Sequence, residues 1–323
     1  MKKSFIITID TEGDNLWAWK HGNPIATENT LFLQRFQDLC NKYGFKPVWL
    51  TNYEMIEDDR YVDFISKAVS SGCGELGMHL HAWNNPPLYE LPLNQNGAPY
   101  LIEYPTEIIE QKIEYITKLI NERTGIKPTS HRAGRWAMNS LYYDMLIKYG
   151  YTADCSVTPL MNWNRSLGQT AGSTGIDYSR ASRSPYYVSG KNIGGAVLEI
   201  PMTTKIAHDL IFGKGGSLKN KLGSIKRAMF GNAVMFRYTG NNLRQLEKWA
   251  VEKASSAEDY LMFMMHSSEL AAGLNPTIKT SADVEKMYAD LDKLFSLIDK
   301  YYVGVTLAEY TAVLGQKGDK TDG

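Results

Sequence analysis

The segment SFIITIDTEGD (Ser4–Asp14) joins an apolar run to a cluster of acidic residues. Its first part, Ser4–Asp10, is rich in isoleucine and bounded by polar residues, which predicts a buried β-strand. Side chains two positions apart on a strand point to the same side, so Asp10 and Glu12 are expected to share one side where this strand ends. The segment therefore predicts a buried strand that directs two carboxylates toward a common site.

The rest of the chain alternates short apolar segments with longer segments of helical period. This alternation predicts a parallel sheet with right-handed crossovers, and up to eight strands predict a closed or nearly closed barrel of the α/β class. We expect one catalytic domain over residues 1–312 and a flexible tail over 313–323. The expected strands cover 4–10, 46–53, 75–83, 127–136, 151–157, 196–203, 259–267 and 302–307, and the expected helices cover 28–44, 61–70, 105–123, 138–150, 243–254 and 282–301.

Two long segments, 84–104 and 159–195, have neither a helical nor a strand pattern. Each follows the C-terminal end of an expected strand, and an α/β barrel carries its active site at that end. Because loops of this length in a compact domain are usually functional, we expect both to border the site.

Composition narrows the class of protein. Hydrophobic residues make up 43% of the 323 residues and charged residues 22%, which is typical of a globular protein, and the formal net charge of zero argues against a nucleic-acid partner. The apolar run after Met1 is too short for an export signal or a membrane span, and three cysteines without paired spacing are consistent with reduced thiols. We therefore expect a cytoplasmic protein without an integral membrane segment.

The segment 205–232 carries six lysine or arginine residues against one acidic residue, Asp209. This pattern predicts a solvated basic helix. Weak contact with a membrane surface is the alternative, and it would require a clear amphipathic face.

A second chemical motif lies in GELGMHLHAW (Gly74–Trp83), where His79 and His81 share one side of an expected strand. Two imidazoles and one carboxylate form a common three-ligand set for catalytic zinc, which leaves a coordination position open for water. Asp10 or Glu12 could supply the carboxylate. Two alternating histidines on a strand end are also compatible with a partly exposed pair that binds nothing. Further polar residues end other expected strands: Arg132, Arg135, Asp154 and His266.

At these residues the chain resembles the polysaccharide deacetylases, the NodB-like carbohydrate esterases, from Ile6 to about Glu309. TIDTEGD is similar to the first family motif, ELGMHLHAW to the second, HRAGRW to the third, DCS to the fourth and MMHSSEL to the fifth. Each motif is weakly specific by itself, whereas their number and order together indicate the family. The resemblance implies an α/β fold that is an irregular (β/α)7-8 barrel of the NodB-like deacetylase type.

The resemblance also implies roles for individual residues. Asp10 would be the general base and His266 the general acid. Arg132 would hold the base, and Asp154 would tune this pair through the arginine. The implied metal ligands are Glu12, His79 and His81, the implied ion is zinc or another divalent ion such as cobalt, and the expected substrate-binding residues are Trp83, Arg135 and Trp136.

Two spacings differ from the family pattern. The first motif usually has adjacent aspartates, whereas Thr11 separates Asp10 from Glu12 here, so the two could exchange roles, with Asp14 a third candidate. The second motif usually separates its histidines by three residues, whereas only Leu80 lies between them here. His79 is therefore the firmer ligand of the two.

The expected activity is metal-dependent hydrolysis of an N-acetyl group on an amino-sugar-containing glycan or glycoconjugate precursor. A cytoplasmic location favours a nucleotide-linked or lipid-linked sugar over a mature polymer. Alternatives are hydrolysis of another amide or an O-acetyl ester, glycoside hydrolysis by Asp10 and Glu269, and carbohydrate binding without catalysis. Aromatic residues that could stack on sugar rings are Trp17, Trp19, Trp83, Tyr100, Trp136, Trp163, Tyr186 and Tyr187.

Overall fold

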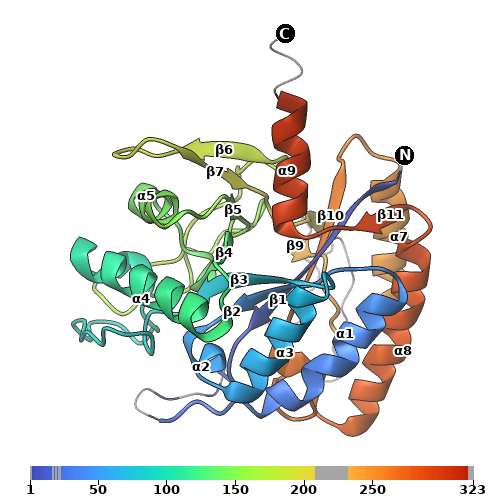
Figure 1. The fold of residues 1–323 in the computed structure, drawn as a ribbon, viewed down its shortest axis with the longest axis horizontal. Helices are drawn as coiled ribbons and strands as arrows, with labels where there is room; N and C mark the ends of the chain where they lie inside the picture. Colours follow the sequence, from blue (N-terminus) through green and yellow to red (C-terminus); the bar gives the residue numbers. More distant parts are fainter. Residues whose placement is uncertain (1, 17, 19, 21–22, 208–231, 319–323) are drawn as a thin grey trace, which may run out of the picture.

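The computed structural model describes residues 2–16, 18, 20, 23–207 and 232–318. Within these residues a curled sheet of nine strands runs through the molecule in the order β10-β1-β2-β3-β4-β5-β7-β6, with β11 also paired to β1 (Figure 1). Every pairing in it is parallel except that of β6 with β7. The strands are β1 (Lys3–Thr11), β2 (Val48–Thr51), β3 (Glu75–Leu80), β4 (Ser130–Ala133), β5 (Ala153–Asp154), β6 (Tyr186–Ser189), β7 (Ala196–Glu199), β10 (Tyr260–His266) and β11 (Tyr302–Gly304).

Helices connect most of these strands and cover the outer face of the sheet, with α1, α3 and α8 around β1 and β2, and α4 and α5 beside β3 to β5 (Figure 1). The α-helices are α1 (Leu33–Lys42), α2 (Tyr53–Ile56), α3 (Asp59–Ser70), α4 (Thr106–Thr124), α5 (Ser140–Tyr149), α7 (Leu243–Ala254), α8 (Ser281–Ile298) and α9 (Leu307–Gly318). Short 3-10 helices are η1 (Glu28–Phe32), η2 (Leu101–Glu103), η3 (Gly134–Trp136) and η4 (Ser267–Leu270).

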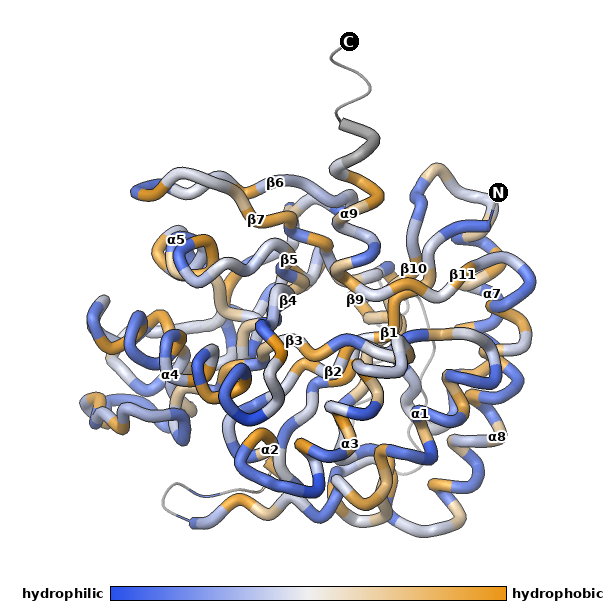
Figure 2. Tube along the Cα trace, in the orientation of Figure 1, coloured by the Kyte–Doolittle hydropathy of each residue, from blue (hydrophilic) through white to orange (hydrophobic). Residues whose placement is uncertain are grey.

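Alternation along the strands divides the interior into two hydrophobic cores. On β1, Phe5, Ile7 and Ile9 belong to the outer core beneath the helices, whereas Ile6 belongs to a smaller core on the inner, concave side of the sheet. On β10, Met262 and Met264 also lie in the inner core. Apolar and polar residues alternate along the helices (Figure 2).

The gap between β7 and β10 is spanned by backbone hydrogen bonds outside the main sheet. Met202 N donates to Val157 O at 2.9 Å, Phe236 N donates to Thr203 O at 2.9 Å, and Met264 N donates to Phe236 O at 3.2 Å. A two-stranded antiparallel unit of β8 (Thr204–Ala207) and β9 (Asn232–Met235) adjoins this bridge. The curled half-barrel confirms the expected irregular α/β barrel.

Some elements differ from the sequence-based expectation. β6 lies inside the expected loop 159–195, because the YYVS segment pairs antiparallel with β7 and needs no crossover helix. Helix α9 continues past residue 312 to Gly318, so the expected tail begins within a helix. Strand β3 ends at Leu80, which places His81 just beyond it. Trp17, Trp19 and most of the basic segment 205–232 lie outside the described residues. Among the described helices, none combines the length and apolar character needed to cross a membrane.

Candidate active site

The inner side of the sheet brings four polar residues to one level. Asp10 on β1 is paired in register with His266 on β10, and His79 on β3 is paired with Arg132 on β4. Each has the parity of the inner core, so all four project from the concave side near the C-terminal ends of their strands. Parallel strands place these ends at one edge, where α/β barrels hold their active sites.

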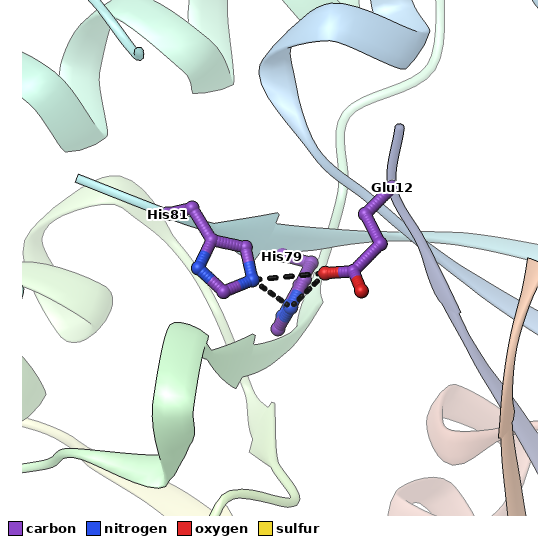
Figure 3. Close-up of side chains that lie close together, drawn as sticks. All are labelled: Glu12, His79 and His81. Carbon is purple, nitrogen blue, oxygen red and sulfur yellow. Dashed lines mark hydrogen bonds and ion pairs between the residues drawn. The ribbon is translucent and has the colours of Figure 1, made fainter. Parts of the chain in front are cut away.

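Glu12, His79 and His81 converge on one point just beyond β1 and β3 (Figure 3). His81 Nε2 lies 2.9 Å from Glu12 Oε2 and 3.1 Å from His79 Nε2, and His79 Nε2 lies 3.6 Å from the same carboxylate oxygen. All three side chains are buried. This group is the only set of three or more candidate ligands within metal-binding reach among the described residues.

The donor set fits a divalent cation. His79 Nδ1 lies 2.8 Å from the carbonyl oxygen of Arg132, an arrangement that fixes the proton on Nδ1 and leaves the Nε2 lone pair facing Glu12 and His81. A carboxylate and imidazole nitrogens at one buried point would repel one another unless a cation or a proton lay between them. These residues could therefore hold a metal, and Glu12 rather than Asp10 is the carboxylate that faces both histidines.

The protonation preferences of the three groups follow their surroundings. Burial acts to raise the pKa of Glu12, but hydrogen bonding to His79 and His81 outweighs it and lowers that pKa. Burial acts to lower the pKa of His79, whereas Asp10 and Glu12 raise it overall. For His81 burial dominates, so its pKa is lowered. Glu12 thus remains ionised, as a ligand must.

Asp10 and Arg132 form a separate buried ion pair beside this group. Arg132 Nη1 donates to Asp10 Oδ1 at 2.5 Å, and Arg132 Nη2 donates to Thr8 Oγ1 at 2.8 Å. Burial acts to raise the pKa of Asp10, but the Arg132 charge prevails and lowers it. Asp10 is therefore held as a carboxylate.

His266 faces both carboxylates from β10. Its Nε2 lies 3.9 Å from Asp10 Oδ2 and 3.8 Å from Glu12 Oε1. The chain bends after His266 because Glu269 Oε2 accepts a hydrogen bond from the His266 backbone N–H at 3.2 Å, while Glu269 Oε1 pairs with Arg237. Both side-chain oxygens of Glu269 are therefore used within this turn, and Glu269 is absent from the described lining of the adjacent cavity. This position argues against a glycosidase mechanism in which Glu269 and Asp10 form the pair of carboxylates.

These groups form the floor of a cavity of about 500 Å³ walled by aromatic rings. Arg135 and Trp136 follow β4 with φ values of 57° and 63°, a left-handed turn that brings both side chains to the cavity. The Trp83 ring lies 4.2 Å from the His81 ring between centroids. All three expected substrate-binding residues, Trp83, Arg135 and Trp136, line this cavity, as do Tyr100 and Trp163.

Asp154 does not join this group. On β5 it is paired in register with His131, and its Oδ1 lies 2.7 Å from His131 Nδ1, on the side of the sheet that faces α5. The expected link from Asp154 through Arg132 is therefore not formed as a hydrogen bond within the described residues. The physical reason is strand parity, because adjacent residues His131 and Arg132 point to opposite sides of the sheet.

Sequence reasoning overlooked a carboxylate beneath the candidate ligands. Glu54 on α2 accepts hydrogen bonds from Gly13 N at 2.7 Å and Asn52 Nδ2 at 3.1 Å, and its second oxygen accepts one from Asn84 Nδ2 at 2.6 Å. Asn52 Oδ1 in turn accepts from His81 N at 3.2 Å. This network ties the segment after β1 to the segment after β3. In the sequence, the polar residues of TNYE at the end of β2 were the feature that could have indicated Glu54.

No family model matches the sequence, and no curated protein matches it. Solved structures do match the fold. A proposed polysaccharide deacetylase from Mycobacterium smegmatis is 13% identical, with 98% of this chain and 92% of that chain covered and a TM-score of 0.55. A 4-alpha-glucanotransferase from Thermococcus litoralis is also 13% identical, with 97% of this chain and 40% of that chain covered and a TM-score of 0.53. The chain has the fold of the NodB-like polysaccharide deacetylases.

Proposed function

We propose that this protein is a metal-dependent hydrolase that removes an acetyl group from the nitrogen of an amino sugar. The observation that carries the proposal is the convergence of Glu12, His79 and His81 beside the Asp10–Arg132 pair on the floor of an aromatic-walled cavity. The shared fold is compatible with several chemistries, so the proposal rests on these residues and not on the fold.

A divalent ion held by Glu12, His79 and His81 would supply Lewis acidity to an acyl oxygen and to water. Asp10, kept ionised by Arg132, accepts a proton from the water that adds to the acyl carbon. His266, whose Nε2 lies within 3.9 Å of an oxygen of each carboxylate, donates a proton to the departing nitrogen as the carbon–nitrogen bond breaks. The products are acetic acid, which ionises to acetate, and a free amine. The proton left on Asp10 then passes to His266, so both residues return to their starting protonation states.

The aromatic walls fit a sugar ring. Trp83, Trp136 and Trp163 present flat apolar surfaces to the cavity, and the carbon-bound hydrogens of a pyranose pack against such rings. The walls also limit the access of bulk water to the buried carboxylates, which strengthens the electrostatic interactions among the charged groups.

The direct test is acetate release by the purified protein from N-acetylglucosamine oligomers, with O-acetylated sugars as the competing substrates. We expect activity after loading with Zn²⁺ or Co²⁺ and its loss with a chelator. Preference for the O-acetyl substrates would reassign the site to ester hydrolysis. A protein that binds no divalent ion and is insensitive to chelator would contradict the proposal and favour a carbohydrate-binding role.

A further inference from the structure

A second cavity of about 460 Å³ adjoins the catalytic cavity. Trp83 and Ala98 line both, so the two form one continuous surface. We propose that this second cavity binds an apolar chain attached to the amino sugar, so that the substrate is a lipid-linked sugar. The inference rests on the proposed deacetylase function and names the substrate class of the same site.

The second cavity is built where the two long loops meet. Gln169 Nε2 donates to Leu91 O at 2.8 Å, and Gln169 O accepts from Asn94 N and Gln95 N, both at 3.0 Å. The loops approach so closely at Gly97 that a Cβ there would lie 1.9 Å from Leu167 O. Only glycine fits that position, and the contact fixes the wall of the cavity.

The base of the first loop is fixed as well. Lys112 on α4 is fully buried, and its Nζ donates to Asn85 O at 2.5 Å and to Pro87 O at 2.7 Å. Asn85 Nδ2 returns a hydrogen bond to Lys112 O at 3.0 Å. A ligand therefore meets a preformed cavity and loses little free energy to ordering the loop.

The lining is apolar or aromatic at most positions. Leu93 is 84% exposed and Tyr89 is 43% exposed, and the neighbouring Leu88 is 74% exposed. Such exposure of large apolar side chains at the rim of a cavity is typical of a surface that is covered when a ligand binds. An apolar chain would remove these apolar side chains from water.

Negatively charged ligands fit this cavity poorly. Among the described residues no lysine or arginine lines it, and Glu90 would repel the diphosphate of a nucleotide. Of the precursors expected from the sequence, the lipid-linked class therefore fits better than the nucleotide-linked class.

The experiment compares acetate release from methyl and octyl β-glycosides of N-acetylglucosamine by the zinc-loaded protein, below the micelle concentration of the octyl compound. We expect a KM at least about tenfold lower for the octyl glycoside, since each buried methylene strengthens binding. Leu93→Ser should remove most of this difference and leave the kinetics on the methyl glycoside unchanged. Val303→Ser, which changes an exposed residue on β11, is the matched control and should preserve the difference.

Equal KM values for the two glycosides would overturn the inference. So would a Leu93-dependent preference for di-N-acetylchitobiose or for UDP-N-acetylglucosamine over the octyl compound. Calorimetric binding separates this inference from the proposed reaction: octyl binding that is weakened by Leu93→Ser supports the apolar site even if no acetate is released. Octyl binding no tighter than methyl binding contradicts it in either case.

Discussion

Two buried polar clusters lie back to back on the same sheet. The inner cluster consists of five residues that line the cavity, Asp10, Glu12, His79, His81 and His266, and of Arg132, which is buried and pairs with Asp10. The outer cluster lies beneath α5 and consists of His131, Tyr142, Tyr143, Asp154, Ser156 and Glu199. Both contain a histidine beside a carboxylate, so residue types alone do not separate them.

The clusters differ in what their polar atoms contact. In the outer cluster, His131 uses both ring nitrogens, with Asp154 Oδ1 at 2.7 Å and Tyr142 OH at 2.8 Å. Glu199 accepts from Val157 N at 3.0 Å and from Tyr143 OH at 2.9 Å. These bonds connect β4, β5, β7 and α5, and none of these residues lines the catalytic cavity. The comparison shows that a histidine–carboxylate pair acquires a chemical role through access to a cavity.

The largest expected effect removes an inner ligand. His79→Ala should reduce zinc affinity by more than about 100-fold, because loss of a ligand costs more than loss of a residue that only supports a ligand. Acetate release should then fall to background. Equilibrium dialysis with zinc analysis measures the first effect. Asp154→Asn, in the outer cluster, should keep the zinc stoichiometry of the wild type. Equal zinc affinities in the two variants would contradict the assignment of metal binding to the inner cluster alone.

The next effect concerns proton transfer. His266→Ala should lower kcat by about 10²–10⁴-fold because the departing nitrogen loses its proton donor. Zinc stoichiometry should remain unchanged, since His266 lies outside the three-ligand group. The measurement is kcat at saturating substrate together with metal content. An unaltered kcat would show that His266 is not the proton donor.

A smaller effect defines how far the inner site extends. Glu54→Ala leaves buried N–H groups of Gly13 and Asn84 without their partner, so the segments that carry Glu12 and His81 lose their link, and zinc affinity should fall by about 10–100-fold. Glu54→Gln should largely restore it, because the buried Asn84 Oδ1, which has no hydrogen-bond partner, can accept from the new amide after rotation. Zinc titration of the metal-free proteins distinguishes the variants. Equal zinc affinities of the alanine variant and the wild type would show that Glu54 does not contribute to the metal site.

The smallest expected effect is on stability in the outer cluster. Burial raises the pKa of Glu199 well above its ordinary value of 4.5, and the neighbouring Asp154 raises it further. The folded state therefore retains a proton that the unfolded state releases, so the stability from Glu199 is complete below pH 4.5 and declines as pH rises. Glu199→Gln removes this titration. Its free energy of unfolding relative to the wild type should rise with pH by up to about 1.4 kcal/mol per unit.

Urea denaturation at pH 5 and pH 8 measures this difference. Acetate release by Glu199→Gln should stay within about twofold of the wild type, because the side chain does not reach the cavity. A pH-independent stability difference would show that Glu199 is ionised in the folded protein.

Much of the inner cluster could be predicted because strand parity is a local property. Asp10 and Glu12, at the end of β1, are two positions apart and therefore point to the same side, and so are His79 and His81 at the end of β3. This relation does not depend on the rest of the structure. The alternation of strands and helices likewise indicated the curled parallel sheet. The order of the motifs then identified Arg132 on β4 and His266 on β10 as candidates.

Only the tertiary structure decided which side Asp154 faces, that Asp10 rather than Glu12 pairs with Arg132, and that the loops around Gly97 and Gln169 form a second cavity. These facts depend on the register between strands and on contacts between segments far apart in the sequence. The side of a strand that faces the cavity follows from how the sheet curls. Local sequence determines which residues share a side, and long-range packing determines what that side meets.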